Sequence, residues 1–548
     1  MDARAKEVSK IGDRLFGKKK IVDTLWQELA YQFYPERADF TDERNAGDEY
    51  SDHLFTSYPS LARRDLGNLM SANMRPSSKQ WGSLHVFDKN LDDGDAERKF
   101  LEYLTDIQWR AMYDSRAGFV RATKQTDHDY VTFGNGVVLG TPNSMRDTLL
   151  YRNYHLRDCA WLENEEGRVD CMFRNWMPEA RQLKALFPET ISRDISKACE
   201  KEPEKQFKCR HIVMPSRMYY YKSKRGKEYP YVSLYIECES QTVLEEVGMN
   251  YFPYVVPRWM TVSGSQYGRS MATDIALPDS RTMQVIVRTL REAGEKFVDP
   301  PMIAVIDAIR GDIPLYAGGI TNVDIEYDEK LGEVLRPVTQ DRGGMPIGFE
   351  LANEVRQSIH QAFFLDKINL PAAQTEMTAF EVRRRVEEHI RAAAPLFEPI
   401  EQDYNAPLCE LTFNILRENN GFPMDKMPDT LLGQDIRFTF HSPLADAYDQ
   451  ADAAIYTDVA QRILVPAAQI DPAQIENADI TAATRDAMKA AGWKAKWFKP
   501  IEAVEERRQQ VQQQMEAQQQ MAAAEQMGGA VEKGGKGVEA IQKAMGEQ

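Results

Sequence analysis

The sequence predicts a helix-rich α+β fold divided into several structural units. The chain has 548 residues, which exceeds one typical domain. Apolar residues recur every three or four positions from Val382 to Ile415, as on one face of a long helix. Strand-like segments are concentrated between residues 149 and 257. Hydrophobic residues make up 43% of the chain, which excludes a largely disordered protein.

The first part of the chain reads as helices around one short strand. Apolar spacing predicts helices over 1–34 and Pro59–Asn73, a strand near Trp81–Phe87, and one or two helices over 94–132. The first helix carries a small basic run, Gly17-Lys-Lys-Lys20. Residues 36–52 are charged and turn-rich, so we expect an exposed loop there.

A mixed α+β region follows. Phe133-Gly-Asn-Gly-Val-Val-Leu139 predicts a tight turn into a strand, and residues 178–200 predict a helical insertion. The remaining strand signals are Leu149–Tyr154, Val169–Trp176, His211–Met214, Tyr229–Glu237 and Tyr251–Arg258.

The second half is dominated by helices. We expect helices over 272–297 and 349–366, separated by a Pro- and Gly-dense insert at 298–348 and followed by a loop at 367–377. Thr378 and Glu381 then form a capping box that starts the long helix. Each of Pro395, Pro399 and Pro407 removes a backbone donor, so we expect kinks. After Phe422 we expect irregular chain to Pro443, a helix over 444–465, and a Gln-rich end.

Charge and cysteine content narrow the function class. The chain has 84 Asp+Glu against 68 Lys+Arg, the opposite of a protein that grips nucleic acid by neutralising phosphates. Its six cysteines form no C-x-x-C pair and read as reduced thiols. No run of 18 apolar residues and no N-terminal signal segment occur, so we expect no secretion and no membrane span.

No convincing catalytic constellation is present. Gly264 to Ser270 faintly resembles a phosphate-binding loop, but its glycines are too close and Arg269 stands where Lys is needed. Thr126 to Tyr130 groups two carboxylates and an imidazole, but successive helical residues splay apart, so we interpret them as a solvated helix surface or helix end. Cys209 and His211 fall short of a zinc set. We expect a non-enzyme without metal or cofactor.

Five strings, in the expected order, resemble the portal proteins (head-to-tail connectors) of short-tailed bacteriophages. They are Leu66-Gly-Asn-Leu-Met-Ser-Ala-Asn-Met-Arg-Pro76 with Trp81, Phe133-Gly-Asn-Gly-Val-Val138, Tyr267-Gly-Arg-Ser270, Val298-Asp-Pro-Pro-Met302 and Met377-Thr-Ala-Phe-Glu-Val-Arg383. The order of helix, compact insert, helix, loop and long kinked helix is similar as well. The C-terminal 80 or so residues match no motif.

The resemblance implies a portal fold with wing, stem, clip and C-terminal crown that assembles as a ring around a central channel. The implied divisions are a wing (1–271), stem helix 1 (272–297), a clip (298–348), stem helix 2 (349–366), a tunnel loop (367–377), a long kinked wing helix with the following segment (378–465), and a crown with a mobile Gln-rich tail (466–548).

The implied function is a dodecameric DNA channel at one capsid vertex of the virion, assembled in the host cytoplasm. Its partners would be further copies of the chain, double-stranded DNA passing without sequence specificity, a terminase motor, tail adaptors, and major capsid or scaffolding protein, with no membrane. By position, the channel candidates are Lys367, Asn369, Gln374, Glu350 and Glu354, and the subunit-interface candidates are Arg383, Arg384, Arg385 and Glu387.

Two alternatives stay open. One is a nucleotide-dependent DNA-processing enzyme that uses the Gly264–Ser270 turn. The other is a helical viral scaffold or tail protein without a channel, suggested by the Gln-rich C-terminus.

Overall fold

The computed structural model describes most of the chain in two compact units. The described residues are 3–43, 45, 47–77, 80–87, 95–219, 228–298, 300–304, 335–337, 344–368, 399–440, 456–470, 479–491, 493, 497–499, 503–504, 506–511, 513–515 and 517. The first unit comprises Met1–Ser83, Asp106–Pro423 and Phe438–Ala445, and the second comprises Leu84–Thr105, Met424–Arg437 and Asp446–Gln548.

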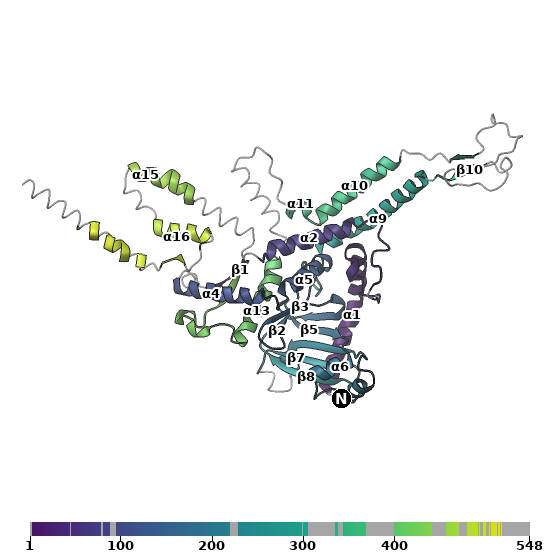
Figure 1. The fold of residues 1–548 in the computed structure, drawn as a ribbon, viewed down its shortest axis with the longest axis horizontal. Coiled ribbons are helices and arrows are strands. Elements are labelled where there is room, and N and C mark those ends of the chain that lie inside the picture. The colour runs from purple at the N-terminus through teal and green to yellow at the C-terminus, as the bar shows by residue number, and fades with distance from the viewer. Residues whose placement is uncertain are drawn as a thin grey trace, which may run out of the picture. The chain divides into compact units, whose positions relative to one another are not determined.

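The largest core of the first unit gathers helices from both ends of the chain (Figure 1). These helices are α1 (Ala3–Phe33), α2 (Tyr58–Met74), α5 (Phe119–Phe133), the start of α9 (Met271–Val298) and α13 (Ala406–Glu418). Large aromatic side chains fill the space between them, and Tyr130 stacks on Trp259 with ring centroids 5.4 Å apart. The single helix over 3–33 and the helix over 58–74 confirm the predictions for these segments.

Two antiparallel sheets belong to the same unit. The larger has the order β4-β5-β6-β7-β8, and the smaller has the order β3-β2-β9. Their strands are β2 (Val138–Pro142), β3 (Leu149–Asn153), β4 (Cys159–Glu163), β5 (Val169–Trp176), β6 (Cys209–Pro215), β7 (Tyr231–Glu237), β8 (Thr242–Met249) and β9 (Tyr254–Val255). Short helices α6 (Ala180–Leu186), α7 (Arg193–Lys201) and α8 (Ser216–Tyr219) lie between these strands in sequence.

The first half of α1 covers the larger sheet. Ala5, Val8 and Leu15 pack in one cluster with sheet residues such as Phe173 and Ile212. Figure 1 shows α1 running beside this sheet from the N-terminus. Further along, Trp26 and Leu29 belong to the main core, so one helix joins the sheet to the helical core.

Helices α9 and α10 (Gly344–Ala362) run side by side as an antiparallel pair (Figure 1). Strands β10 (Met302–Ala304) and β11 (Leu335–Pro337) pair antiparallel within the insert that connects the two helices. Helix α10 begins earlier than the predicted 349 and ends at Ala362, and a short helix α11 (Leu365–Ile368) follows. Phe364 separates them with φ of 56°, a left-handed conformation that ends the helix.

The predicted kink at Pro407 corresponds to a π-helix. Residues Glu401–Asn405 form this π-helix directly before α13. In an α-helix the Pro407 ring would collide with the carbonyl of Asp403, and the wider π turn relieves that collision. A second π-helix, Ala460–Leu464, precedes Pro466 at the same spacing, so one cause accounts for both. Pro395 and the start of the long helix lie outside the described residues.

The second unit has few described elements. They include part of α4 (Asp95–Met112), 3-10 helices at Met424–Lys426 and Asp429–Leu431, and helices α15 (Val465–Ile470) and α16 (Ile480–Ala490). Strands β1 (Gly82–Val86) and β12 (Ile436–Phe440), each of which belongs partly to the first unit, form a two-stranded sheet, and β12 lies in a segment predicted to be irregular. No helix among the described residues is long and apolar enough to span a bilayer.

Candidate functional site

The α9–α10 pair is the strongest candidate for the functional surface because it exposes large apolar side chains. The side of α10 that carries Ala352, Val355 and Ile359 is buried. Gly348 lets the helices approach closely, since a Cβ there would lie 2.7 Å from Leu290 Cδ2. Beyond this contact the far half of α9 has no fully buried residue, so the pair is covered there on one side only.

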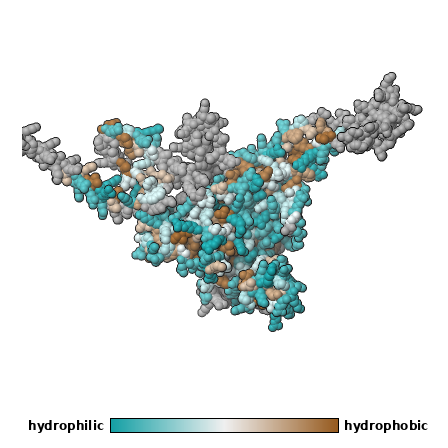
Figure 2. Space-filling model, viewed as in Figure 1, coloured by the Kyte–Doolittle hydropathy of each residue, from teal (hydrophilic) through white to brown (hydrophobic). Residues whose placement is uncertain are grey.

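The rest of the α10 surface divides into three faces. At about 100° per residue, Ile347 and Leu351 share one flank, and Phe349 lies about 200° round from Ile347 on the other. These side chains are 67%, 45% and 55% exposed. Between the flanks, directly opposite the buried side, lie the exposed polar residues Glu350 and Gln357. Figure 2 shows hydrophobic and hydrophilic residues interspersed along this pair of helices.

The exposed surface of α9 is mixed in the same way. Val285 is largely exposed, while Arg288 pairs with Glu292 one turn on, Nε to Oε1 2.8 Å. Arg281 makes a close ion pair with Glu28 of α1, which fixes α9 to the body of the unit. Pro278 lies inside α9 and leaves one intrahelical hydrogen bond unmade.

The structure brings few of the predicted site residues into view. Glu350 and Glu354 are exposed on α10, with Glu350 on the polar face and Glu354 nearer the flank of Ile347 and Leu351. Lys367 lies in α11, of which only the backbone is described at this position. The other predicted residues, Asn369, Gln374, Arg383, Arg384, Arg385 and Glu387, lie outside the described residues.

The interpretation of Thr126 to Tyr130 as a solvated surface is wrong. Asp127 and Asp129 are buried on α5, and each carboxylate faces an arginine from a distant part of the sequence. Arg75 pairs with Asp127 at close range, and Arg37 Nη2 lies 3.0 Å from Asp129 Oδ2. A buried carboxylate is tolerated when such a partner is present, but spacing within one helix cannot reveal that partner.

Arg75 of this pair also contacts the π-helix Glu401–Asn405. Arg75 Nη1 donates to Asn405 Oδ1 at 2.7 Å, and its guanidinium lies 4.4 Å from the Tyr404 ring centroid. Burial raises the pKa of Asp127, and the attraction of Arg75 opposes that rise. These contacts join α2, α5 and the segment that leads into α13 within one unit. The arrangement is a structural anchor.

His128, between the two aspartates, is half-buried and meets a cation. Its Nδ1 lies 3.0 Å from Arg63 Nη1. Burial, followed by the charge of Arg63, lowers the pKa of His128 to about 4. The imidazole is therefore neutral at pH 7 and accepts a hydrogen bond from Arg63. Among the described residues no group of three His, Cys, Asp or Glu could hold a metal ion.

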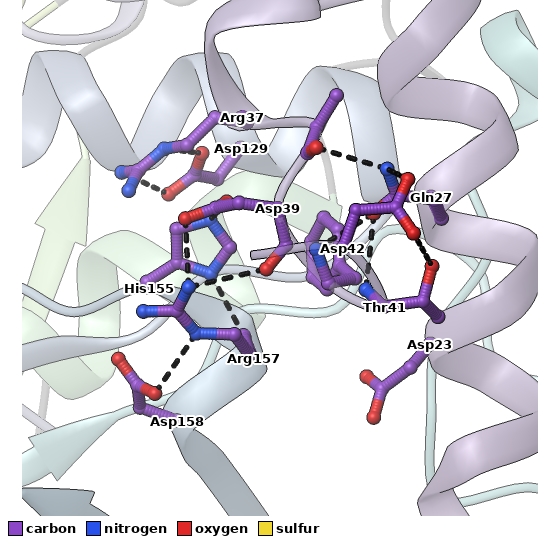
Figure 3. Close-up of polar contacts among 12 residues, drawn as sticks. Asp23, Gln27, Arg37, Asp39, Thr41, Asp42, Asp129, His155, Arg157 and Asp158 are labelled. Carbon is purple, nitrogen blue, oxygen red and sulfur yellow. Dashed lines mark hydrogen bonds and ion pairs between the residues drawn. The ribbon is translucent and has the colours of Figure 1, made fainter. Parts of the chain in front are cut away.

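Residues 36–52 are less exposed than expected, because part of the loop is pinned against the core (Figure 3). Gln27 of α1 donates through Nε2 to the Ala38 carbonyl at 2.9 Å and accepts from the Phe40 amide at 2.7 Å. Asp39 lies 2.7 Å from His155 Nε2 and 2.8 Å from Arg157 Nη1. Burial opposes the ionisation of Asp39, but His155 and Arg157 outweigh it and lower the pKa of Asp39.

The Gly264–Ser270 turn is held in place by hydrogen bonds to neighbouring segments. Its Gly268 amide donates to Asn135 Oδ1 at 2.8 Å, and the Arg269 amide donates to the Met260 carbonyl at 2.8 Å. The Ser270 hydroxyl donates to the Val131 carbonyl at 2.5 Å. A phosphate-binding loop needs such amides free to point at the anion. Here the Gly268 amide ties the turn to the residues after α5, and the Arg269 amide ties it to Met260.

A cavity of about 560 Å³ lies beside this turn, and apolar side chains of α1 form much of its lining. Trp26, Leu25 and Leu29 form its wall, and Arg269 and Asp274 contribute charged groups. Arg269 Nε lies 3.5 Å from Asp274 Oδ2, so the two charges form a loose, partly exposed ion pair. The lining is therefore mainly apolar and carries one loose ion pair at the surface.

Comparison with known proteins places the chain among phage connectors. The family model described as "Bacteriophage head to tail connecting protein" matches residues 5–498. A "Probable portal protein" of Bordetella phage BPP-1 is 25% identical over 457 residues, covering 80% of this chain and 78% of the relative. The "Portal protein" of Salmonella phage epsilon15 is 23% identical over 519 residues, covering 91% of this chain and 90% of the relative.

Solved structures with a similar chain come from gene transfer agent particles. One, from the virion of a native particle, has a TM-score of 0.33 and 10% identity, covering 74% of this chain and 89% of the other. Another, from the neck of an empty particle, has a TM-score of 0.34 and 12% identity, with the same coverage of 74% and 89%.

Proposed function

The chain belongs to the bacteriophage head-to-tail connecting protein family and serves as a portal-type connector, and we propose that twelve copies form a ring around a DNA channel at one capsid vertex. The genome would be packaged, retained and ejected through this channel. The observation that carries the proposal is the three-sided character of the exposed part of α10.

A helix in the wall of a ring must meet its own subunit, a neighbour on each flank, and the channel. Helix α10 offers a surface for each of these contacts. Its buried side packs within its own subunit, one flank carries Ile347 with Leu351, and the other carries Phe349 beside the exposed Arg356. In a ring the contact is heterologous, so the flank of one copy meets the opposite flank of the next. The remaining face, with Glu350 and Gln357, is then directed to the axis.

The polar face also has the right charge for a conduit. A wall rich in Lys and Arg would neutralise phosphates and hold the DNA in place. Glu350 at the axis repels phosphates and lets the duplex slide. Glu354, nearer the flank, contributes less to this repulsion. The tunnel loop 367–377, with Lys367, Asn369 and Gln374, would project from the end of this helix and touch the DNA, and Arg383, Arg384, Arg385 and Glu387 would lie at the subunit interface.

We further propose that the role is non-enzymatic. The Gly268 and Arg269 amides are engaged within the fold, which supports a structural part for that turn. A terminase motor, not this chain, would supply the energy for packaging and would dock at the 298–348 clip. Tail adaptors would bind the clip end of the ring after packaging. Capsid or scaffolding protein would contact the ring at the vertex.

Two matched substitutions on α10 test the ring. Leu351→Glu places a charge on an apolar flank, whereas Gln357→Glu places the same charge on the polar face. We expect Leu351→Glu to abolish rings in negative-stain images and native mass measurements, with unchanged monomer folding by circular dichroism. Gln357→Glu should form rings like the unmodified chain. Equal behaviour of the two variants would refute the assignment of the faces.

A further inference from the structure

A row of cations winds slowly round the outer side of α1, away from the α9–α10 pair in sequence. Lys6, Lys10, Arg14 and Lys18 follow one another at intervals of four residues, and all four side chains are exposed. Successive members are about 6 Å apart along the axis, so the row is about 18 Å long. It ends next to the Gly17-Lys-Lys-Lys20 run.

The fold fixes the direction in which this row faces. Ala5, Val8 and Leu15 on the same helix are buried against the larger sheet. At about 100° per residue, Lys10 lies close to diametrically opposite the middle of that buried face. Lys6 and Arg14 lie about 40° to either side of it, so packing on the sheet holds these three cations outward, and Lys18 lies about 80° round at the side of the helix.

The cations of the row are free of ion pairs among the residues that the structure describes. Asp13 on the same helix is already paired with an arginine of the sheet. Arg210 Nη2 lies 3.0 Å from Asp13 Oδ1. Glu7 is exposed beside the row and offsets one of its charges. Residues 1–20 carry seven Lys and Arg against three Asp and Glu, in a chain whose net charge is −16. The basic surface is therefore local and contrasts with the rest of the protein.

We propose that this row is a binding site for the backbone of double-stranded DNA outside the channel. Duplex DNA carries one phosphate charge per about 1.7 Å of axis, so a row of long cationic side chains finds phosphates in any register. Such contacts position the duplex without reading its sequence. The inference goes beyond the conduit, and it does not depend on which face of α10 meets the axis.

The composition of the row favours DNA over an acidic protein surface. Specific protein interfaces are built around apolar or aromatic anchors with a polar rim. Between Lys6 and Lys18 the outer side of α1 exposes no large hydrophobic side chain, and the first is Ile21. A surface of flexible cations without an anchor binds a polyanion through counterion release and little else.

Covalently closed circular DNA isolates this site, because a closed circle cannot thread a preassembled ring. The full-length assembled protein is titrated with a relaxed closed circle and with a linear duplex of the same sequence, at several salt concentrations. The test variant replaces Lys6, Lys10, Arg14 and Lys18 by Gln. The matched control replaces Lys184, Arg193, Lys197 and Lys201 of α6 and α7, four exposed cations, by Gln.

We expect the unmodified protein and the control to bind the circle. The test variant should lower the slope of log affinity against log salt by about 3 and weaken binding at least about tenfold at low salt. Circular dichroism should be the same for all three proteins, since every substituted side chain is exposed.

Three results would overturn the inference. The first is an unmodified protein that binds the linear duplex but not the circle, and the second is a test variant that binds the circle as well as the control does. The third is a test variant that loses ring formation instead of DNA binding, which would assign the row to an acidic surface of a second copy. Failure of the unmodified chain to form rings would refute the proposed function instead, and binding of the circle would still be measurable.

Discussion

Removal of the buried guanidinium of Arg75 should strongly lower the free energy of unfolding of the first unit. Arg75 and Asp127 are each 3% exposed, so Arg75→Met leaves a carboxylate without its cation in a dry site. Breaking a buried pair from one side destabilises by about 3–5 kcal/mol. Arg75→Met also removes the hydrogen bond to Asn405 and the contact with Tyr404, so the upper half of that range is expected.

The double variant separates the ion pair from its surroundings. Arg75→Met with Asp127→Leu leaves no uncompensated charge, so its loss should be smaller than the sum of the single losses by at least about 2 kcal/mol. The assay is urea unfolding of the unassembled chain, followed by tryptophan fluorescence. Arg288→Met serves as control, because its exposed pair with Glu292 contributes only about 0.5 kcal/mol. Additive single losses, or an Arg75→Met loss no larger than that of the control, would refute this reasoning.

Other residues give sharper local tests. Because the pKa of His128 is lowered to about 4, the unfolded chain binds a proton between about pH 6.5 and 4 that the folded chain does not. The free energy of unfolding should therefore fall as the pH is lowered from about 6.5 to 4, by up to about 1.4 kcal/mol per pH unit, less the screening of a half-buried group. His128→Gln should flatten this pH dependence. Gly134→Ala should destabilise by about 2 kcal/mol or more in denaturant melts, since φ is 68° and the new Cβ would overlap the Arg269–Ser270 backbone. Gly264→Ala, also at positive φ but in open space, should lose only about 1–2 kcal/mol, and equal losses would contradict the overlap. Glu350→Lys should leave rings intact on micrographs but slow the passage of linear DNA in a packaging assay, and unaltered passage would argue against an axial Glu350.

The sequence predicted those elements whose signals are local. The helices at 1–34, 59–73 and 272–297 carry continuous apolar periodicity, and the structure contains helices at Ala3–Phe33, Tyr58–Met74 and Met271–Val298. The turn after Phe133 needs a left-handed residue, and Gly134 supplies it at φ of 68°. In both cases the information lies within one or two turns of chain.

Long-range partners could not be predicted in this way. Asp127 and Asp129 look like solvent-facing acids because their arginines are 52 and 92 residues away. Edge strand β8 was missed because Glu245 and Glu246 break its apolar alternation, a composition typical of a protected sheet edge. The cation row on α1 was a signal that spacing could have revealed, since its members recur every four residues.

The faces of α10 depended on burial that only the structure supplies. Its sequence shows apolar residues at 347, 349 and 351, which no single helical face can hold. With Ala352, Val355 and Ile359 buried, these positions become two separate flanks. A helix with more apolar faces than its own subunit covers is expected where a neighbouring copy is needed.

An electron cryo-microscopy map of the assembled full-length chain tests the central claim most directly. The account predicts a closed ring of twelve copies in which the face of Glu350 and Gln357 lines the central channel, with Leu351 of one copy against the Phe349 flank of the next. An open or channel-free assembly, or a ring in which Glu350 and Gln357 lie on the outer surface, would contradict it.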